Sequence, residues 1–403
     1  MKVNSKLLKG SIILLITFNI FSFLNFMFQF SMARLLSVEE YGALAALVSL
    51  VYIMNLFTES IQLVVTKYTS SESNSGKIKN IAHKSLMPLL VLSACIFAAY
   101  ALVSFPLSGA LKINYWILVF NALIIFPFCF LPLTRGILQG RKMFKQLGLN
   151  MIMETSIKLL LAIVLVLGGF GVAGAVGATL AGALLAFGIS IISLRDIIKS
   201  KEEKARYDIA DVHKYSLPAF IVTASVIAMY SIDIIIAKIV FDEKTAGIYA
   251  VASILGKIII WGTIPISKAM FPLSSEKNNK KNASDTIFFN SLALLGVLIL
   301  AALVVFYIFP ELIVRIFSGK SLPQAASILF YIGIGMGLIS FANLNLMYKM
   351  SRGETRRSYL LLIFVIIEAL LLWRFSSNLI EFSIAFITAS AAFLWGSVVL
   401  LKK

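Results

Sequence analysis

Apolar segments of about twenty residues or more recur along the whole chain, and they constrain its fold more than any other feature. A segment of this length is long enough to cross the hydrocarbon core of a membrane as a helix. None of the segments alternates apolar and polar residues as a barrel strand does. The sequence therefore predicts an all-α integral membrane protein with twelve transmembrane helices. The predicted spans are residues 11–33, 42–66, 86–108, 114–140, 147–168, 172–194, 214–240, 247–272, 286–309, 323–348, 358–376 and 380–400.

Composition and charge agree with this prediction, since 60% of the residues are hydrophobic, 14% are charged and the mean hydropathy is +0.94. The net charge of +17, from 36 Lys and Arg against 19 Asp and Glu, is unevenly distributed: the loops and chain ends on one side carry 25 cations and the loops on the other side carry six. Positively charged loops remain in the cytoplasm, so both termini are predicted to be cytoplasmic. The charge is explained by membrane topology, with membrane lipids as partners, and no nucleic acid is predicted.

A sequence repeat divides the chain. Residues 33–45 return in degenerate form at 237–250, and each copy has a cation at the end of an apolar run, a short acidic loop and a glycine. We interpret the copies as tandem repeats of one membrane unit. Because each copy has an even number of helices, six, both copies begin on the same side of the membrane and run through it in the same direction. The sequence therefore predicts parallel repeats. The predicted parts are an N-terminal six-helix lobe (1–194), a cytoplasmic linker (195–213) and a C-terminal six-helix lobe (214–403).

Three motifs carry a resemblance to a known family: residues 34–42, residues 135–140, and residues 231–233 followed by 246–249. They resemble the polysaccharide-biosynthesis flippases, the O-antigen and repeat-unit transporters of the MOP superfamily, to which the MATE exporters also belong. The resemblance implies two six-helix lobes around a central cavity that opens to either side of the membrane in turn. It also implies transport of undecaprenyl-pyrophosphate-linked oligosaccharide from the inner to the outer leaflet. Related lipid II flippases have two additional C-terminal helices, which argues against lipid II as the substrate.

Ionisable side chains at membrane depth are costly and therefore indicate function. The cations Lys257, Lys158 and Arg135 are predicted to line the substrate route, because they can neutralise a pyrophosphate held away from water. Arginine near a helix end can instead extend to the head groups, and Glu154 with Lys158, four residues apart, can form a structural ion pair. The carboxylates that are candidate sites for a coupled H⁺ or Na⁺ are Asp233, Glu154, Glu368 and Glu59.

The repeat also suggests a gate. Arg34 and Lys238 end the first apolar run of each copy, and the charge alternation places both at the outer membrane boundary. They are candidate outer-gate residues. Lys257 and Glu368 each lie about ten residues inside a predicted span, so they are expected near the middle of the membrane and facing a water-filled cavity.

No metal site or other cofactor is predicted. His83 and His213 lie at the edges of basic loops, and Cys95 and Cys129 lie inside apolar segments, so no cluster has the spacing of metal ligands. Residues 169–174 match the dinucleotide pattern GxGxxG, but they join two apolar segments rather than a strand and a helix. The small residues here are predicted to serve close helix packing, as are Gly333 and Gly337.

The sequence therefore predicts an alternating-access flippase in the plasma or inner membrane that performs no bond chemistry. Its expected partners are a lipid-linked oligosaccharide and other polysaccharide-assembly proteins. One alternative is a cation-coupled multidrug exporter of the same superfamily, because the deep charges are of both signs. The other is a membrane-embedded glycosyltransferase or polymerase. Such an enzyme normally has a large extramembrane loop with acidic residues, and the predicted outer loops are short.

Overall fold

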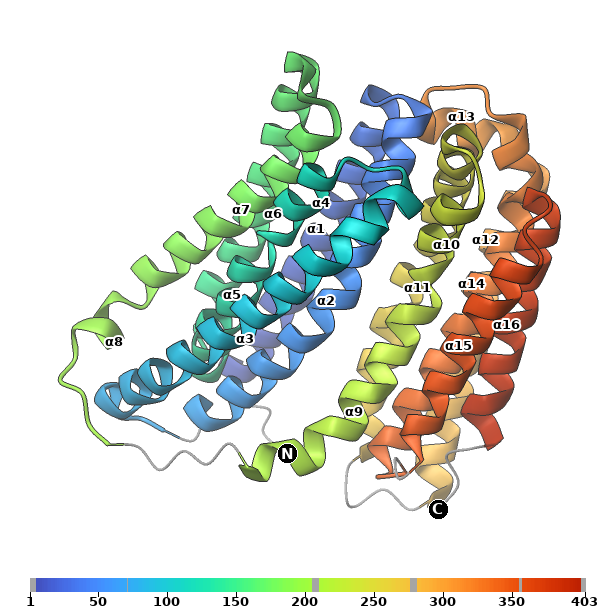
Figure 1. Ribbon diagram of the computed structural model, residues 1–403. Coiled ribbons are helices and arrows are strands. Elements are labelled where there is room, and N and C mark those ends of the chain that lie inside the picture. Colours follow the sequence, from blue (N-terminus) through green and yellow to red (C-terminus); the bar gives the residue numbers. More distant parts are fainter. Residues whose placement is uncertain (1–4, 71, 205–209, 276–280, 355–356, 400–403) are drawn as a thin grey trace. The chain divides into compact units, whose positions relative to one another are not determined.

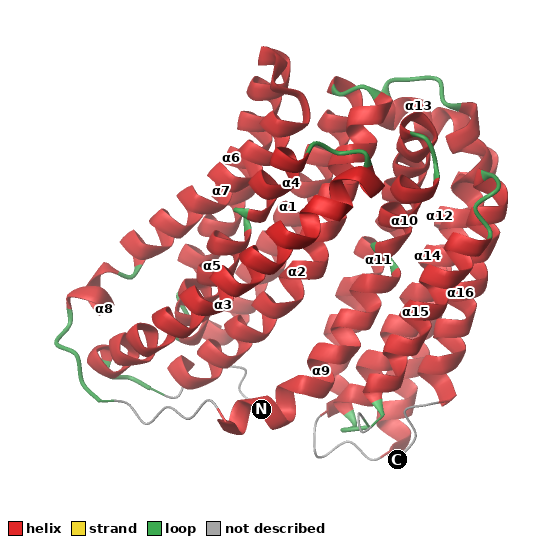
Figure 2. Ribbon diagram, viewed as in Figure 1, coloured by secondary structure: helices red, strands yellow, loops and turns green. Residues whose placement is uncertain are grey.

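The computed structural model describes residues 5–70, 72–204, 210–275, 281–354 and 357–399. Within these ranges the chain forms helices joined by short loops, and it contains no strand (Figure 2). The helices of the first half are α1 (Ser5–Leu35), α2 (Val38–Ser70), α3 (Ser75–Leu111), α4 (Tyr115–Ala122), α5 (Ile125–Gly140), α6 (Phe144–Leu165), the π-helical turn η1 (Val166–Phe170), α7 (Gly171–Ser193) and α8 (Arg195–Lys199). The second half contains α9 (Ala210–Met229), α10 (Ile232–Val240), α11 (Glu243–Ser275), α12 (Lys281–Ile308), α13 (Pro310–Ser318), α14 (Pro323–Ser351), the 3₁₀ turn η2 (Ser358–Leu360), α15 (Leu361–Arg374) and α16 (Leu379–Val399).

The all-helical membrane fold is confirmed. Of the helical stretches in the described ranges, eight are long and apolar enough to cross a membrane, or nine if the bent pair α9 and α10 forms one span. One of the eight, Phe144–Ser193, contains α6 and α7, which pack against each other and lie side by side in Figure 1. The chain reverses between them at Gly169 (φ +87°) and Gly171 (φ +48°), in the backbone region that favours glycine. This stretch is therefore two antiparallel helices, as the sequence predicts.

The chain divides by its contacts into two compact units. Unit 1 comprises Met1–Leu36 and Met54–His213, and unit 2 comprises Ser37–Ile53 and Lys214–Lys403. This division differs from the predicted lobes at two places. The first part of α2 packs within unit 2, and the described part of the linker, residues 195–204, packs within unit 1.

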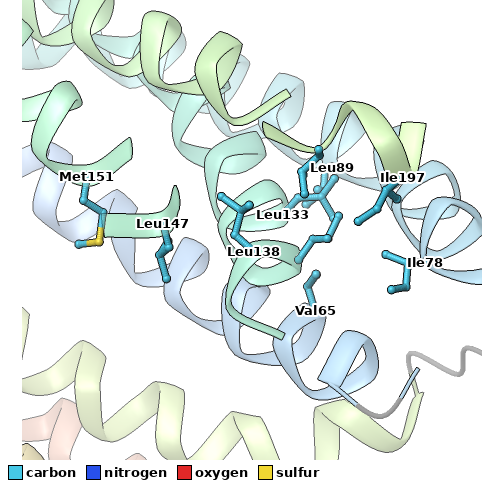
Figure 3. Close-up of a cluster of buried hydrophobic side chains, with 10 residues drawn as sticks. Val65, Ile78, Leu89, Leu133, Leu138, Leu147, Met151 and Ile197 are labelled. Atoms are coloured by element: carbon cyan, nitrogen blue, oxygen red, sulfur yellow. The ribbon is translucent and has the colours of Figure 1, made fainter. Parts of the chain in front are cut away.

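Unit 1 contains three helix pairs that pack closely: α6 packs against α7 and against α1, and α3 packs against α5. A cluster of buried apolar side chains joins α2, α3, α5, α6 and α8. Figure 3 shows Leu89 of α3, Leu133 of α5 and Ile197 of α8 directed toward one another within this cluster. The short helix α8 is thereby fixed to the rest of the unit.

The linker that follows α8 is fixed to the start of α3 by polar contacts. The backbone N–H of Glu203 donates to the carbonyl oxygen of Gly76 at 3.2 Å, and Lys79 Nζ donates to the carbonyl of Ser200 at 3.0 Å. Glu202 accepts a hydrogen bond of 2.6 Å from Asn80 Nδ2. This bond, and next the neighbouring His83, lowers the pKa of the Glu202 carboxyl. We call residues 200–204 in this position the linker clasp.

Unit 2 is organised around α14, which packs against α11, α12, α13 and α16. Two glycines four residues apart allow the close approach of α12. A Cβ added to Gly333 would lie 2.9 Å from the ring of Phe306, and one added to Gly337 would lie 2.9 Å from Ile299. The predicted packing role of these two glycines is confirmed.

The two copies of the sequence repeat both begin a helix with a polar cap. In the first copy, the Glu40 N–H donates to Ser37 Oγ at 3.1 Å and the Ser37 N–H donates to the Glu40 carboxylate at 3.0 Å. This reciprocal arrangement is a capping box. In the second copy, Asp242 accepts hydrogen bonds from the N–H groups of Lys244 and Thr245, and the hydrogen bonds from Thr245 lower its pKa. The acidic loops of the repeat are therefore helix starts.

Candidate functional site

Unit 2 contains a break in the middle of a predicted span. α9 ends at Met229 and α10 begins at Ile232, and the two helices are bent by 40°. Asp233 therefore lies in the first turn of α10, where the positive end of the helix dipole favours a carboxylate. Broken helices at membrane depth are tolerated where they are buried in protein or line a cavity. The break thus introduces a carboxylate into the interior of unit 2, where Asp233 is 0% exposed.

One face of α11 meets this carboxylate. Tyr249, Ser253 and Lys257 are spaced by four residues, which places them on the same side of the helix. Ser253 Oγ donates to Asp233 Oδ2 at 2.5 Å, and Tyr249 Oη donates to the same oxygen at 3.2 Å. The ammonium of Lys257 lies 3.6 Å from the other oxygen, Oδ1. Three side chains of a single helix therefore contact the Asp233 carboxylate.

Glu368 of α15 completes this cluster. It interacts electrostatically with both Asp233 and Lys257, and it is fully buried. Neither of its carboxylate oxygens has a hydrogen-bond partner among the described residues. With both carboxylates ionised and Lys257 protonated, the cluster has a formal charge of −1. We call Asp233, Lys257 and Glu368 the buried triad.

Unit 1 contains a second cluster, on α5 and α6. Arg135 donates through Nε to Asn150 Oδ1 at 2.9 Å and through a terminal nitrogen to Glu154 Oε2 at 2.5 Å. The amide nitrogen of Asn150 donates in turn to the carbonyl oxygen of Ala186 in α7 at 2.6 Å. Arg135 and Glu154 are each 13% exposed. Glu154 therefore forms its ion pair with Arg135, the partner from the neighbouring helix.

Lys158 lies on the same face of α6, four residues beyond Glu154. Its ammonium donates to the amide oxygen of Asn25 and lies 4.6 Å from the centre of the Phe28 ring, both on α1. These two contacts are with uncharged groups. The formal charge of Arg135, Glu154 and Lys158 together is +1. We call these three residues the basic cluster.

The predicted substrate-binding and gate residues are divided between the two units. Lys257 belongs to unit 2, whereas Lys158 and Arg135 belong to unit 1, so their joint contact with one substrate remains a prediction. Arg34 belongs to unit 1 and stacks on Phe30 at 4.5 Å, and Lys238 belongs to unit 2, buried and 4.0 Å from Glu243. A joint outer gate therefore also remains a prediction. The side chain of Glu59 lies outside those that the structure describes.

Lys257 and Glu368 were expected to face a water-filled cavity, and in this structure both are 0% exposed. Lys257 is instead enclosed with Asp233. Four side chains that contact the buried triad or the basic cluster were not predicted: Tyr249, Ser253, Asn25 and Asn150. Two of the helices carry a signal for them, because residues 249, 253 and 257 and residues 150, 154 and 158 recur at a spacing of four. Among the described residues, no group of three or more His, Cys, Asp or Glu is arranged to hold a metal ion.

Comparison with solved structures shows the fold. The fold matches an inward-facing multidrug resistance MATE family transporter of the MOP superfamily with a TM-score of 0.78, at 16% identity, over 93% of each chain. It matches an outward-facing structure described in the same way with a TM-score of 0.65, at 17% identity, over 98% of this chain and 96% of the other. A MOP superfamily transporter from Pyrococcus furiosus, for which reverse polarity of the binding pocket suggests a different function, matches with a TM-score of 0.64, at 17% identity, over 99% and 96%. The chain therefore has the fold of the MATE transporters.

Sequence comparison defines the family. The model of the family described as polysaccharide biosynthesis protein matches residues 31–327, so the chain belongs to that family. An uncharacterized membrane protein of Methanocaldococcus jannaschii is 25% identical over an aligned length of 387 residues, and the alignment covers 91% of this chain and 90% of that protein. The predicted resemblance is confirmed. The protein is therefore a multi-pass membrane protein of the polysaccharide biosynthesis family, with the fold of the MATE transporters.

Proposed function

We propose that this protein is an alternating-access flippase that moves a polyprenyl-pyrophosphate-linked oligosaccharide from the cytoplasmic to the outer leaflet of the cell membrane. Such a substrate has three parts with different needs. The polyprenyl chain is stable in lipid, whereas the sugars and the pyrophosphate must be shielded from hydrocarbon. The protein therefore has to supply polar contacts for the sugars and positive charge for the pyrophosphate.

The observation that carries the proposal is the net positive charge of the basic cluster. The Arg135 guanidinium is neutralised by Glu154 at 2.5 Å, and the Lys158 ammonium is held by the neutral amide of Asn25. An anionic group that reaches Lys158 replaces a neutral acceptor with a charged one, which strengthens the hydrogen bond. We assign pyrophosphate binding to Lys158, with Arg135 as its neighbour. A pocket for a cationic drug would favour the opposite sign.

The proposed topology follows the charge of the loops. Each of the twelve predicted segments lies on a helix or on consecutive helical pieces, as far as the described ranges extend. We propose twelve spans in two six-helix lobes around a central cavity, with both termini in the cytoplasm. In this orientation the membrane potential favours outward movement of an anion by about 2.3 kcal/mol per charge per 100 mV. A coupled H⁺ or Na⁺ can add to this driving force, and the carboxylates proposed for it are Asp233, Glu154, Glu368 and Glu59.

The proposal is tested by deleting the gene and measuring on which leaflet the lipid-linked oligosaccharide accumulates. We expect accumulation on the cytoplasmic face, with restoration of export by the wild-type gene. Normal glycan export together with altered sensitivity to cationic drugs would identify an exporter instead. Shorter glycan chains with normal leaflet distribution would point to a polymerase, and the proposal would then be wrong.

A further inference from the structure

The buried triad holds a cation that cannot leave, and this property suggests which ion the site exchanges. We infer that Lys257 is a resident counter-cation that occupies the place of a monovalent metal ion, so that the triad exchanges a proton at Glu368 and excludes Na⁺. The inference names the coupling ion of the proposed transport function and rests on that function for its purpose. The site itself is defined by the contacts of the side chains within unit 2.

Asp233 is in contact with three side chains of α11. One of its oxygens accepts hydrogen bonds from Ser253 at 2.5 Å and from Tyr249 at 3.2 Å, and the other faces the Lys257 ammonium at 3.6 Å. Hydrogen-bond donors and a nearby positive charge both favour an ionised carboxylate. Asp233 and Lys257 therefore form an ion pair with no formal net charge, although neither Asp233 Oδ1 nor Lys257 Nζ has a hydrogen-bond partner among the described residues.

Glu368 is the remaining charge. A buried carboxylate without hydrogen bonds is far less stable as an anion than one in water. The groups that face it are Asp233 from α10 and Lys257 and Tyr249 from α11. From α16 and η2, the other elements packed against α15, the titratable side chains are Glu381 and Tyr359, and both are exposed. One proton on Glu368 makes the triad formally neutral, and the charged groups that act on Glu368 among the described residues are Asp233 and Lys257.

The exchange is a simple proton transfer. Glu368 releases its proton to water as its O–H bond breaks, and the electron pair remains on the carboxylate. The triad then has a charge of −1, which is stable only where water reaches it. Loss of the proton therefore favours a conformation that hydrates this part of unit 2, and protonation favours the buried conformation. Glu368 can couple protonation to conformation because, among the described residues, its carboxylate oxygens accept no hydrogen bond that would stabilise the anion.

The Lys257 ammonium is the reason why the triad exchanges a proton and not Na⁺. An ammonium carries the same charge as Na⁺, but it is attached to α11 and cannot dissociate. While it lies at Asp233, a sodium ion would meet a site that already contains one positive charge. Removing the ammonium leaves two carboxylates with no cation. The substitution Lys257→Met, which keeps an unbranched side chain of similar length, should therefore convert the triad into a site for Na⁺.

The test uses purified full-length protein in detergent and measures binding of radioactive ²²Na⁺ at mildly alkaline pH. We expect no saturable binding by the wild type and saturable binding by Lys257→Met that is lost in the double variant Lys257→Met/Glu368→Gln. The matched control is Lys268→Met, an exposed lysine on the same helix, which should behave as the wild type. Saturable binding by the wild type, or none by folded Lys257→Met, would overturn the inference.

A second measurement does not depend on the folding of Lys257→Met. The infrared band of a protonated carboxyl group should be present in the wild type at neutral pH and should disappear in Glu368→Gln. Persistence of the whole band in Glu368→Gln would show that the proton is elsewhere. Neither measurement uses a glycan, so a failure here leaves the flippase proposal intact. A protein that passes both tests but moves no lipid-linked sugar would contradict only the proposed function.

Discussion

Gly42 and Gly247, the glycines of the two repeat copies, pack against each other: a Cβ built on Gly42 would lie 2.8 Å from the Cα of Gly247. A Cβ built on Gly247 would overlap the backbone carbonyl of Val38. The first part of α2 and the start of α11 thus cross at their repeat-related positions within unit 2. The two helices can approach this closely because glycine has no side chain at either position. The glycines of the two repeat copies therefore lie at a helix crossing.

Gly247→Ala is therefore expected to destabilise the protein. The added methyl group meets backbone atoms, which cannot move aside as a flexible side chain can, and overpacking of this kind typically costs about 1–3 kcal/mol. The thermal midpoint of unfolding in detergent measures the effect. Gly262→Ala, also on α11 and with no atom within 4 Å of the added Cβ, is the matched control and should be unchanged or more stable. Equal midpoints for Gly247→Ala and the wild type would contradict the crossing.

Lys158→Gln is expected to lower transport of the lipid-linked oligosaccharide by about tenfold or more, because a lost hydrogen bond to a charged group costs about 1.5–3 kcal/mol. The amount of protein in the membrane should not change, since the partners of Lys158 on α1 are uncharged. The control is Lys145→Gln, an exposed lysine near the start of the same helix. If both variants transport at the wild-type rate, Lys158 does not bind the substrate.

Glu202→Gln is expected to loosen the linker clasp. The substitution replaces the Glu202 carboxylate, which Asn80 and His83 contact, with a neutral amide. The backbone N–H of Glu203, which donates to the carbonyl oxygen of Gly76, should then exchange faster with deuterated water. Because the folded state lowers the pKa of Glu202, its contribution to the clasp is present at neutral pH and is lost as the pH falls through that lowered pKa. Hydrogen–deuterium exchange of residues 200–204 measures the change. Asp196→Asn, which removes an exposed carboxylate of α8, should leave the exchange unaltered.

Lys349→Met is expected to free the end of α16. The Lys349 ammonium donates to the carbonyl oxygens of Ser397 at 2.7 Å and Val398 at 2.5 Å, in the last turn of that helix. A cation at this position satisfies terminal carbonyls and interacts favourably with the helix dipole. Faster deuterium exchange near the end of α16 is the expected result. Unchanged exchange there would show that these bonds contribute little, and exposed Arg357→Met serves as the control.

The fold was largely predictable because hydrophobicity determines it. Long apolar segments can satisfy their backbone groups in lipid only as helices, so the segments were visible from the sequence alone. Helix breaks were not visible in the same way. Nothing in the apolar run 214–240 indicated that the helix would stop at Met229 and restart at Ile232. Residues 37–53 belong to unit 2 and contact it at Gly42–Gly247 and Tyr41–Phe317, which join residues far apart in sequence.

The charged residues of the two clusters could be singled out from the sequence, but their contacts with one another and with neutral side chains could not. Depth in the membrane identified Lys257, Glu368 and Asp233, because charges there are rare. Their partners depend on which helices meet. The spacing of four residues suggested that Glu154 would pair with Lys158, but Arg135 on α5 lies closer and has a guanidinium suited to a carboxylate. Which cation pairs with a carboxylate depends on the contacts between helices, whereas residue spacing gives information about one helix only.

The central claim is tested most directly by reconstituting the purified protein into vesicles with a fluorescent polyprenyl-pyrophosphate-linked oligosaccharide in both leaflets. A membrane-impermeant glycosidase then reports how much glycan reaches the outer surface. The account predicts that the protein makes the inner-leaflet pool accessible far faster than in protein-free vesicles, and that Lys158→Gln slows this process. Accessibility equal to that of protein-free vesicles, with the same preparation transporting a cationic drug, would contradict it.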